Sequence, residues 1–293
     1  MRLKDKVAII TGGGRGIGEA IALAFAREGA NLALAARTAS EIEQVAQAIA
    51  ALGRTACTIP ADVSKSADVK RFVERAIDAY GKIDILVNAA GTYGPIGRLW
   101  EVDAQEWVRA TEVNLFGTLY CCQAVLPGMM ARRQGKIINF SGGGATAPLP
   151  RFTAYGVSKT AVVRLTETLA QEAQEFNIQV NAIAPGAVNT RMQDEVLAAG
   201  ERAGDMLPRM RRLRETGEGS VPPERAANLA VFLASAASDS LTGRLIAAPY
   251  DGWESWTADR IAALTELPWF TLRRLDPHTL RPFLDQAAPK NPK

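Results

Sequence analysis

Short, continuous apolar runs alternate with longer stretches of mixed apolar and polar residues along most of this chain. A continuous apolar run is typical of a strand buried on both faces of a parallel sheet, and apolar residues at helical spacing predict a helix packed on that sheet. The predicted strands are Val7–Ile10, Asn31–Ala36, Thr55–Ile59, Ile83–Val87, Gly135–Phe140, Ile178–Ile183 and Leu245–Ala248.

Helices are predicted between these strands. Pro127-Gly128 is expected to stop the longest of them, because proline lacks the backbone N–H that a helix interior uses. The regular alternation predicts an α/β fold with a single Rossmann-type, doubly wound parallel sheet and helices on both faces. The predicted helices end at Arg27 or span Ser40–Leu52, Ala67–Tyr80, about Asp103 to Leu126, Tyr155 to about Phe176, and Pro223 to Ala236.

Two segments depart from the alternation. The polar, glycine-punctuated segment 190–220 follows the sixth strand, so we expect it to form a substrate lid. The main domain spans 1–248, and the aromatic-rich extension 249–293 is expected to pack on that domain or on a neighbouring subunit. His278, the only histidine, is expected in a surface turn of the extension without a catalytic role.

Composition narrows the class of protein. With 293 residues, 47% hydrophobic and 22% charged, the chain is an ordinary soluble globular protein. Its 34 basic and 31 acidic residues are well mixed, which argues against a nucleic-acid partner. No signal peptide and no apolar run of ~18 residues is evident, so we expect a cytoplasmic protein without membrane contact. Three cysteines form neither a disulfide framework nor a metal site, and Cys121 and Cys122 are expected in the core.

A glycine-rich turn follows the first strand and opens a helix. Glycines let the backbone approach a pyrophosphate closely, and the helix N-terminus offers unpaired N–H groups. Because the next strand follows at βαβ distance, this turn indicates a dinucleotide site. Its candidate cofactor-binding residues are Gly12, Arg15, Gly16, Ile17 and Gly18.

The end of the second strand bears on the choice of nucleotide. Ala36 and Arg37 stand where an NAD site commonly has a carboxylate for the ribose hydroxyls. Arg37 is able to pair with a 2′-phosphate, and Arg15 is placed to reach it from the other side. This favours NADP over NAD, although both arginines also suit a solvated surface.

Further candidates lie where later strands and helices begin or end. Ligands in such sheets bind beyond the carboxyl ends of the strands, which places Asp62, Val63 and the turn Asn88, Ala89, Gly91 in the cofactor crevice. Tyr155 and Lys159 are one helical turn apart, so they emerge on the same face, where a cation lowers the pKa of a phenol.

These pieces together resemble the short-chain dehydrogenases/reductases, over about residues 5–248. The resemblance implies a Rossmann-type oxidoreductase that uses NAD(P), often as a tetramer built partly on the helices of Asn114 and Tyr155. It also implies Tyr155 as acid/base, Lys159 on the nicotinamide ribose, Asn114 holding a relay water, and the turn with Pro185, Val188 and Thr190 holding the carboxamide. The matching residues are Thr11–Gly18, Asp62-Val63, Asn88–Gly91, Asn114, Tyr155, Lys159 and Pro185-Gly186.

One position departs from the family pattern. The substrate-orienting serine usually stands where this chain has Gly142, one residue after Ser141. Ser141 is therefore a catalytic candidate only if the strand end shifts, because adjacent side chains on a strand face opposite ways. Thr153 is another hydroxyl in the neighbourhood.

The sequence thus predicts an NADP-dependent enzyme that interconverts a carbonyl and a secondary alcohol of a small molecule, working as a homo-oligomer. One alternative is a regulatory or structural protein that kept the cofactor site, suggested by Gly142. Another is a nucleotide-sugar epimerase or dehydratase that uses the same tyrosine. The arginine cluster Arg209, Arg211, Arg212 and Arg214 suits either an anionic substrate or a solvated helix face.

Overall fold

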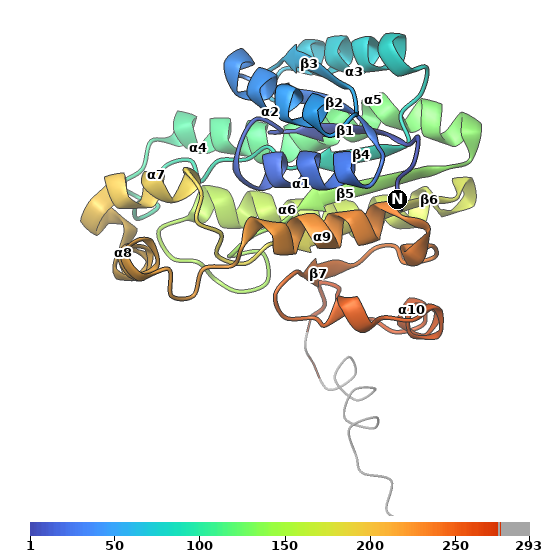
Figure 1. Ribbon diagram of the computed structural model, residues 1–293. Coiled ribbons are helices and arrows are strands. Elements are labelled where there is room, and N and C mark those ends of the chain that lie inside the picture. The colour runs from blue at the N-terminus through green and yellow to red at the C-terminus, as the bar shows by residue number, and fades with distance from the viewer. Residues whose placement is uncertain (275, 277–293) are drawn as a thin grey trace, which may run out of the picture.

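One seven-stranded sheet organises the molecule in the computed structural model, which describes residues 1–274 and 276 (Figure 1). All neighbouring strands are parallel, in the order β3-β2-β1-β4-β5-β6-β7. The order reverses between β1 and β4, and sheets of this kind bind their ligands in a crevice at such a point, beyond the carboxyl ends of the strands. The predicted α/β fold is confirmed. The strands are β1 Val7–Thr11, β2 Asn31–Ala36, β3 Ala56–Pro60, β4 Ile85–Asn88, β5 Gly135–Phe140, β6 Ile178–Ala184 and β7 Leu245–Ala247.

Two buried apolar clusters cover the two faces of the sheet. Along β1, Ala8 and Ile10 belong to the cluster under α1, α2 and α9, whereas Ile9 belongs to the cluster under α3, α5 and α6. This alternation follows from the two-residue repeat of a strand. Cys121 and Cys122 lie buried in the second cluster, as expected for core residues. The helices named here are α1 Gly16–Arg27, α2 Ala39–Ala51, α3 Ser66–Tyr80, α5 Gly117–Arg132, α6 Thr153–Glu172 and α9 Pro223–Ala234.

The long helical segment differs from its prediction. It consists of α4 Ala104–Thr111, the π-helical turn η1 Glu112–Phe116, and α5, which continues through Pro127 to Arg132. Proline removes only one helical hydrogen bond, and the turn after it buries Met129 completely, so packing outweighs the loss. Pro127-Gly128 therefore does not end the helix.

This segment also corrects the expectation about apolar length. Residues Ala104–Arg132 are long and apolar enough, by length and composition alone, to cross a membrane. The core helices of soluble proteins meet the same criterion, and α5 packs against α3 and the strands β4 and β5.

The last two segments lie at different ends of the sheet (Figure 1). Segment 190–220 contains α7 Met192–Ala199, the 3-10 turn η3 Gly200–Ala203 and α8 Met206–Thr216, which lie together at the left of Figure 1. The described part of the extension contains the 3-10 turn η5 Trp253–Ser255 and α10 Ala258–Thr265, beside β7. His278 lies outside the described residues.

Candidate active site

The glycine-rich turn joins β1 to α1 at the carboxyl edge of the sheet. Gly12 and Gly16 adopt φ of 66° and 57°, a region that favours glycine. A Cβ on Gly18 would lie 2.2 Å from the Gly12 carbonyl oxygen, so only glycine permits this close packing of turn and helix. The turn thus keeps its backbone and the start of α1, with Arg15 and Ile17, open toward a ligand.

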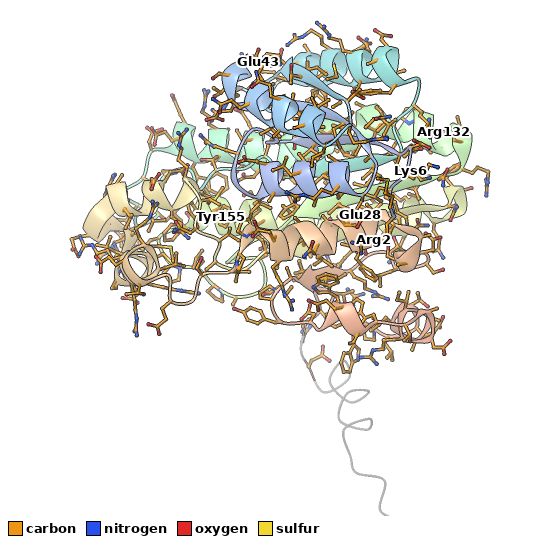
Figure 2. The ribbon with its side chains drawn as sticks, in the orientation of Figure 1. Arg2, Lys6, Glu28, Glu43, Arg132 and Tyr155 are labelled. Carbon is orange, nitrogen blue, oxygen red and sulfur yellow. The ribbon has the colours of Figure 1, made fainter. Side chains whose placement is uncertain are left out.

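Tyr155 and Lys159 project from the first turns of α6, which begins at Thr153, two residues before its predicted start. Both side chains are buried, and Tyr155 lies toward the end of the molecule where α7 and α8 project (Figure 2). Lys159 Nζ lies 5.7 Å from the Tyr155 ring centre and donates to the Phe140 carbonyl over 2.8 Å. The structure therefore brings the two residues to one face, with the ammonium over the ring.

Burial dominates the protonation of this pair. It raises the pKa of Tyr155 well above its ordinary value, and the nearby Tyr93 and Glu195 add to the rise. Burial also lowers the pKa of Lys159 to about 8. Tyr155 consequently holds its proton throughout the neutral range, which suits a group that donates rather than accepts.

Asn114 connects the two sides of the crevice. It is fully buried in η1, where its amide nitrogen donates to the Thr92 carbonyl over 2.9 Å and to Ser158 Oγ over 3.0 Å. Its amide oxygen accepts from the Thr92 N–H over 3.0 Å, and Ser158 Oγ donates to the Tyr155 carbonyl over 2.9 Å. A Cβ on Gly91 would lie 3.1 Å from the Asn114 amide oxygen and 3.4 Å from Lys159 Nζ. The β4 turn, Asn114 and the start of α6 thus form one connected cluster.

Position 142 faces Tyr155. A Cβ built on Gly142 would lie 2.0 Å from the Tyr155 hydroxyl oxygen. The Ser141 hydroxyl is buried and has no hydrogen-bond partner within the part of the chain that the structure describes. Thr153 Oγ1 accepts from the Trp107 indole over 3.1 Å. Because adjacent positions on a strand face opposite ways, position 142 is favoured over Ser141 as the neighbour of the Tyr155 hydroxyl.

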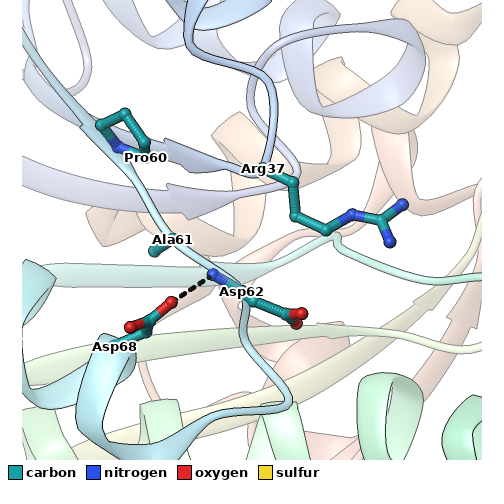
Figure 3. A pocket seen from close by; sticks show the side chains of 5 residues that line it. All are labelled: Arg37, Pro60, Ala61, Asp62 and Asp68. Carbon is teal, nitrogen blue, oxygen red and sulfur yellow. Dashed lines mark hydrogen bonds between the residues drawn. The ribbon is translucent and has the colours of Figure 1, made fainter.

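Arg37 reaches into a pocket of about 240 Å³ at the ends of β2 and β3, which Pro60, Ala61, Asp62 and Asp68 also line (Figure 3). Figure 3 shows Arg37 and Asp62 extending to the same side, away from Asp68. Asp68 accepts from the Asp62 N–H over 3.0 Å. Arg37 is exposed and makes no ion pair among the described residues, which leaves its guanidinium available to an anion.

Arg15 is less free than the sequence suggested. Its Nη1 lies 3.3 Å from a Glu41 carboxylate oxygen, and Arg191 Nη1 lies 3.0 Å from the same oxygen. Glu41 stands in the first turn of α2, so it links the glycine-rich turn to the start of segment 190–220. An incoming phosphate therefore competes with Glu41 for Arg15.

The turn after β6 lies against the glycine-rich turn. A Cβ on Gly16 would lie 3.2 Å from Thr190 Cγ2, and Val188 is buried with its carbonyl accepting from Gln193 Nε2 over 2.7 Å. Pro185 precedes Gly186, whose φ is 81°. This places Thr190 across the crevice opening from α1.

The remaining predicted cofactor-binding residues, Asn88, Ala89 and Val63, make packing and hydrogen-bond contacts near the carboxyl ends of the strands. Asn88 is buried and donates to Asn139 Oδ1 over 2.9 Å, while its own amide oxygen has no partner among the described residues. Ala89 packs against the first core cluster. A Cβ on Gly117 would lie 2.8 Å from Val63, so Val63 touches the start of α5.

Sequence reasoning missed four residues at this site. Thr92 and Tyr93 follow the β4 turn, and Glu195 on α7 accepts from the Tyr93 N–H over 3.2 Å and from Thr92 Oγ1 over 3.4 Å. Ser158 belongs to the motif of Tyr155 and Lys159 but carried no predicted role. Its place four residues from Ala154 and three from Tyr155 puts it on the inner helix face, which is the signal available in the sequence.

The site suits a dinucleotide better than a metal. The glycine cradle, the open start of α1 and the unpaired Arg37 match a pyrophosphate and its flanking groups. No group of three histidine, cysteine or acidic side chains is placed to hold a metal ion in residues 1–274 and 276.

Comparisons with known proteins agree with this geometry. The family described as short chain dehydrogenase matches residues 6–200. Over 248 residues the chain is 38% identical to oxidoreductase UcpA of Salmonella typhimurium, covering 83% of this chain and 92% of that protein. It is 35% identical over 247 residues to 2-(S)-hydroxypropyl-CoM dehydrogenase 3 of Xanthobacter autotrophicus, covering 84% and 96%. The crystal structure of NAD+-bound xylitol dehydrogenase matches with a TM-score of 0.79 and 26% identity, covering 84% of this chain and 98% of that one.

Proposed function

We propose, on the premise that this chain belongs to the short-chain dehydrogenase/reductase family and is an oxidoreductase, that it interconverts a carbonyl and a secondary alcohol with NADP. The observation that carries the proposal is the cluster of Tyr155, Lys159 and Asn114 at the crevice of the sheet. The alcohols named in two of the similar proteins, hydroxypropyl-CoM and xylitol, support this substrate class.

In this mechanism a nicotinamide held in the site would supply the hydride, and the protein would supply the proton. Tyr155 donates its hydroxyl proton to the substrate oxygen, a role that its raised pKa favours in the direction of carbonyl reduction. Lys159, held by the Phe140 carbonyl, binds the ribose beside Tyr155. Asn114 fixes the β4 turn and the start of α6 and holds a relay water.

A carbonyl panel assayed with NADPH and NADH tests the activity, by loss of nucleotide absorbance. Tyr155→Phe removes only the proton donor, so it should bind nucleotide normally and lose turnover by at least ~10²-fold. Tyr120→Phe on α5 is the matched control and should turn over like the wild type. Turnover of Tyr155→Phe within a few-fold of the wild type would sink the assigned mechanism.

The preference for NADP rests on Arg37. The unpaired Arg37 guanidinium, in the pocket at the end of β2, stabilises a 2′-phosphate, although the carboxylates of Asp62 and Asp68 nearby weaken the attraction. Arg37→Asp should weaken NADPH binding by about 10- to 100-fold, since a charged hydrogen bond contributes about 1.5–3 kcal/mol, and should spare NADH. Arg75→Asp, an exposed change of equal charge on α3, should leave both affinities alone. An equal loss for both nucleotides in Arg37→Asp would remove the argument for NADP.

Three further features belong to the proposal. The domain spans 1–248 with the lid at 190–220, and 249–293 is an extension. The enzyme works in the cytoplasm as a homo-oligomer, either a dimer or a tetramer. Exposed apolar side chains on α4, η1 and α6, which are Val108, Phe116 and Val157, support association through these helices.

A further inference from the structure

The Tyr155 hydroxyl has no second donor on the sheet side of the site. Position 142, which faces Tyr155, has no side chain, and a Cβ there would lie 2.0 Å from the Tyr155 hydroxyl oxygen. Tyr155 thus occupies the space that a hydroxyl-bearing side chain would need. Thr153 Oγ1 bonds to the Trp107 indole, and Ser141 is next to Gly142 on the strand end, where adjacent side chains face opposite ways. A second donor for the substrate oxygen therefore has to come from elsewhere.

Tyr93 is the polar side chain that packs directly on Tyr155. The two ring centres lie 4.8 Å apart with the ring planes at 61°, and the Tyr93 ring also meets Phe152 at 5.3 Å. Tyr93 comes from the turn after β4, whereas the carbonyl that accepts from Lys159 belongs to Phe140 on β5. Two aromatic contacts therefore fix its ring over the reacting group.

The backbone beside Tyr93 is fixed by the same groups that form the site. Both the N–H and the carbonyl of Thr92 bond to the Asn114 side chain, and Glu195 accepts from the Tyr93 N–H over 3.2 Å. The Gly94 N–H donates to Thr92 Oγ1 over 3.2 Å. A segment held at three successive residues places its side chain reproducibly, as a substrate-orienting group requires.

The Tyr93 hydroxyl is available to a ligand. Among the described residues it forms no hydrogen bond, and the side chain is partly exposed. Burial raises its pKa, the charge of Glu195 on α7 adds to the rise, and Arg209 on α8 opposes it. The phenol is therefore protonated at neutral pH and lies between Tyr155 and the lid helices.

We propose that Tyr93 donates the second hydrogen bond to the substrate's carbonyl oxygen, in place of the serine that is absent at Gly142. The inference rests on the proposed carbonyl–alcohol reaction. Tyr155 transfers its proton to that oxygen, and Tyr93 keeps its own proton and only orients and polarises the carbonyl. The donor thus enters from the lid side of the site instead of from the end of β5.

The test is Tyr93→Phe in the full chain, which keeps both ring contacts and deletes one hydroxyl. With the best substrate of the carbonyl panel, kcat should fall by about 10²-fold, as for loss of one donor to a developing oxyanion. Nucleotide affinity, measured by fluorescence titration, should stay within twofold. Tyr120→Phe is again the matched control, and Tyr93→Gln, which retains an N–H donor, should recover part of the lost kcat.

The possible results distinguish a failure of the role proposed for Tyr93 from a failure of the proposed function. An active wild type with an equally active Tyr93→Phe overturns the role of Tyr93 and leaves the proposed function intact. A fall in nucleotide affinity that accounts for the whole loss of activity also overturns it, because the effect is then structural. A wild type that turns over no carbonyl or alcohol with either nucleotide overturns the proposed function and this inference together.

Discussion

Gly142→Ala is the sharpest perturbation that the structure offers. The backbone at position 142 is not in the left-handed region, so an alanine is compatible with its conformation. The added Cβ would nevertheless lie 2.0 Å from the Tyr155 hydroxyl oxygen and 2.7 Å from the ring carbon that bears it. The clash therefore falls on the reacting group itself.

The size of the effect follows from these distances. Real Cβ contacts essentially never fall below 3.0 Å, so the Tyr155 oxygen has to move by at least about 1 Å. A misplacement of ~1 Å at a reacting group is able to cost ~10²-fold in rate. We expect kcat to fall by about that factor, with nucleotide affinity unchanged, because the glycine-rich turn and Arg37 are untouched.

Gly143→Ala is the matched control. A Cβ at this next position would have Leu149 Cδ2 at 3.8 Å as its nearest neighbour, an ordinary van der Waals contact. Gly142→Ser adds a hydroxyl to the same steric change, so its difference from Gly142→Ala measures what a donor at this position contributes. The assay is steady-state kinetics with NADPH at saturating carbonyl, alongside fluorescence titration of the nucleotide. Equal turnover of Gly142→Ala and Gly143→Ala would refute the view that Tyr155 occupies the side-chain space of position 142.

Three other variants test the packing around the site. Trp253→Ala loses buried apolar area and the tilted ring contact with Phe232 at 5.7 Å, so it should lower the free energy of unfolding by about 3–5 kcal/mol in urea titrations; an unchanged midpoint contradicts this. Asn139→Ala removes the oxygen acceptor of the buried Asn88 amide and leaves it only the weaker Cys122 sulfur, so it should cost about 1–3 kcal/mol in the same assay; a loss below 0.5 kcal/mol argues against it. Burial lowers the pKa of Lys159 to about 8, against an ordinary lysine value of 10.5, so the buried charge destabilises the folded protein most below pH 8. In melts without nucleotide, the Tm of Lys159→Met should therefore exceed that of the wild type most below pH 8. The difference in Tm should shrink as the pH rises toward 10.5. A pH-independent difference in Tm would contradict that folded pKa.

The sheet was predictable because its central strands, such as β1 and β4, are buried on both faces. The run Ile178–Ile183 needs no partner to identify it as a strand, and the structure extends it by one residue, to Ala184. The glycine-rich turn was equally clear from its sequence, because a side chain on Gly18 would collide with the Gly12 backbone where α1 packs against the turn. Local sequence and tertiary burial agree in these elements, so either suffices to place them.

Tertiary packing decided the features that the sequence did not indicate. Pro127 has the sequence signature of a helix end, yet the buried Met129 beyond it keeps α5 intact. Asn114 lies in a π-helical turn, and its amide bonds to Thr92 and Ser158, which are distant from it in sequence. Tyr93 has no periodic pattern around it, so its place over Tyr155 emerges only once the β4 turn meets α6.

The extension beyond residue 248 covers the edge of the sheet that β7 would otherwise leave exposed. A free edge strand invites pairing with another chain, and β7 is the last strand on its side. The Leu245 N–H of β7 instead donates to the Phe270 carbonyl over 2.7 Å, and the Arg244 guanidinium donates to the Leu264 carbonyl at the end of α10. Because Leu264 and Trp253 are buried in the same core cluster as α9, the aromatic residues of the extension anchor this cover. Association through the β7 edge would have to displace it, which directs the proposed oligomer to the α4 and α6 surface.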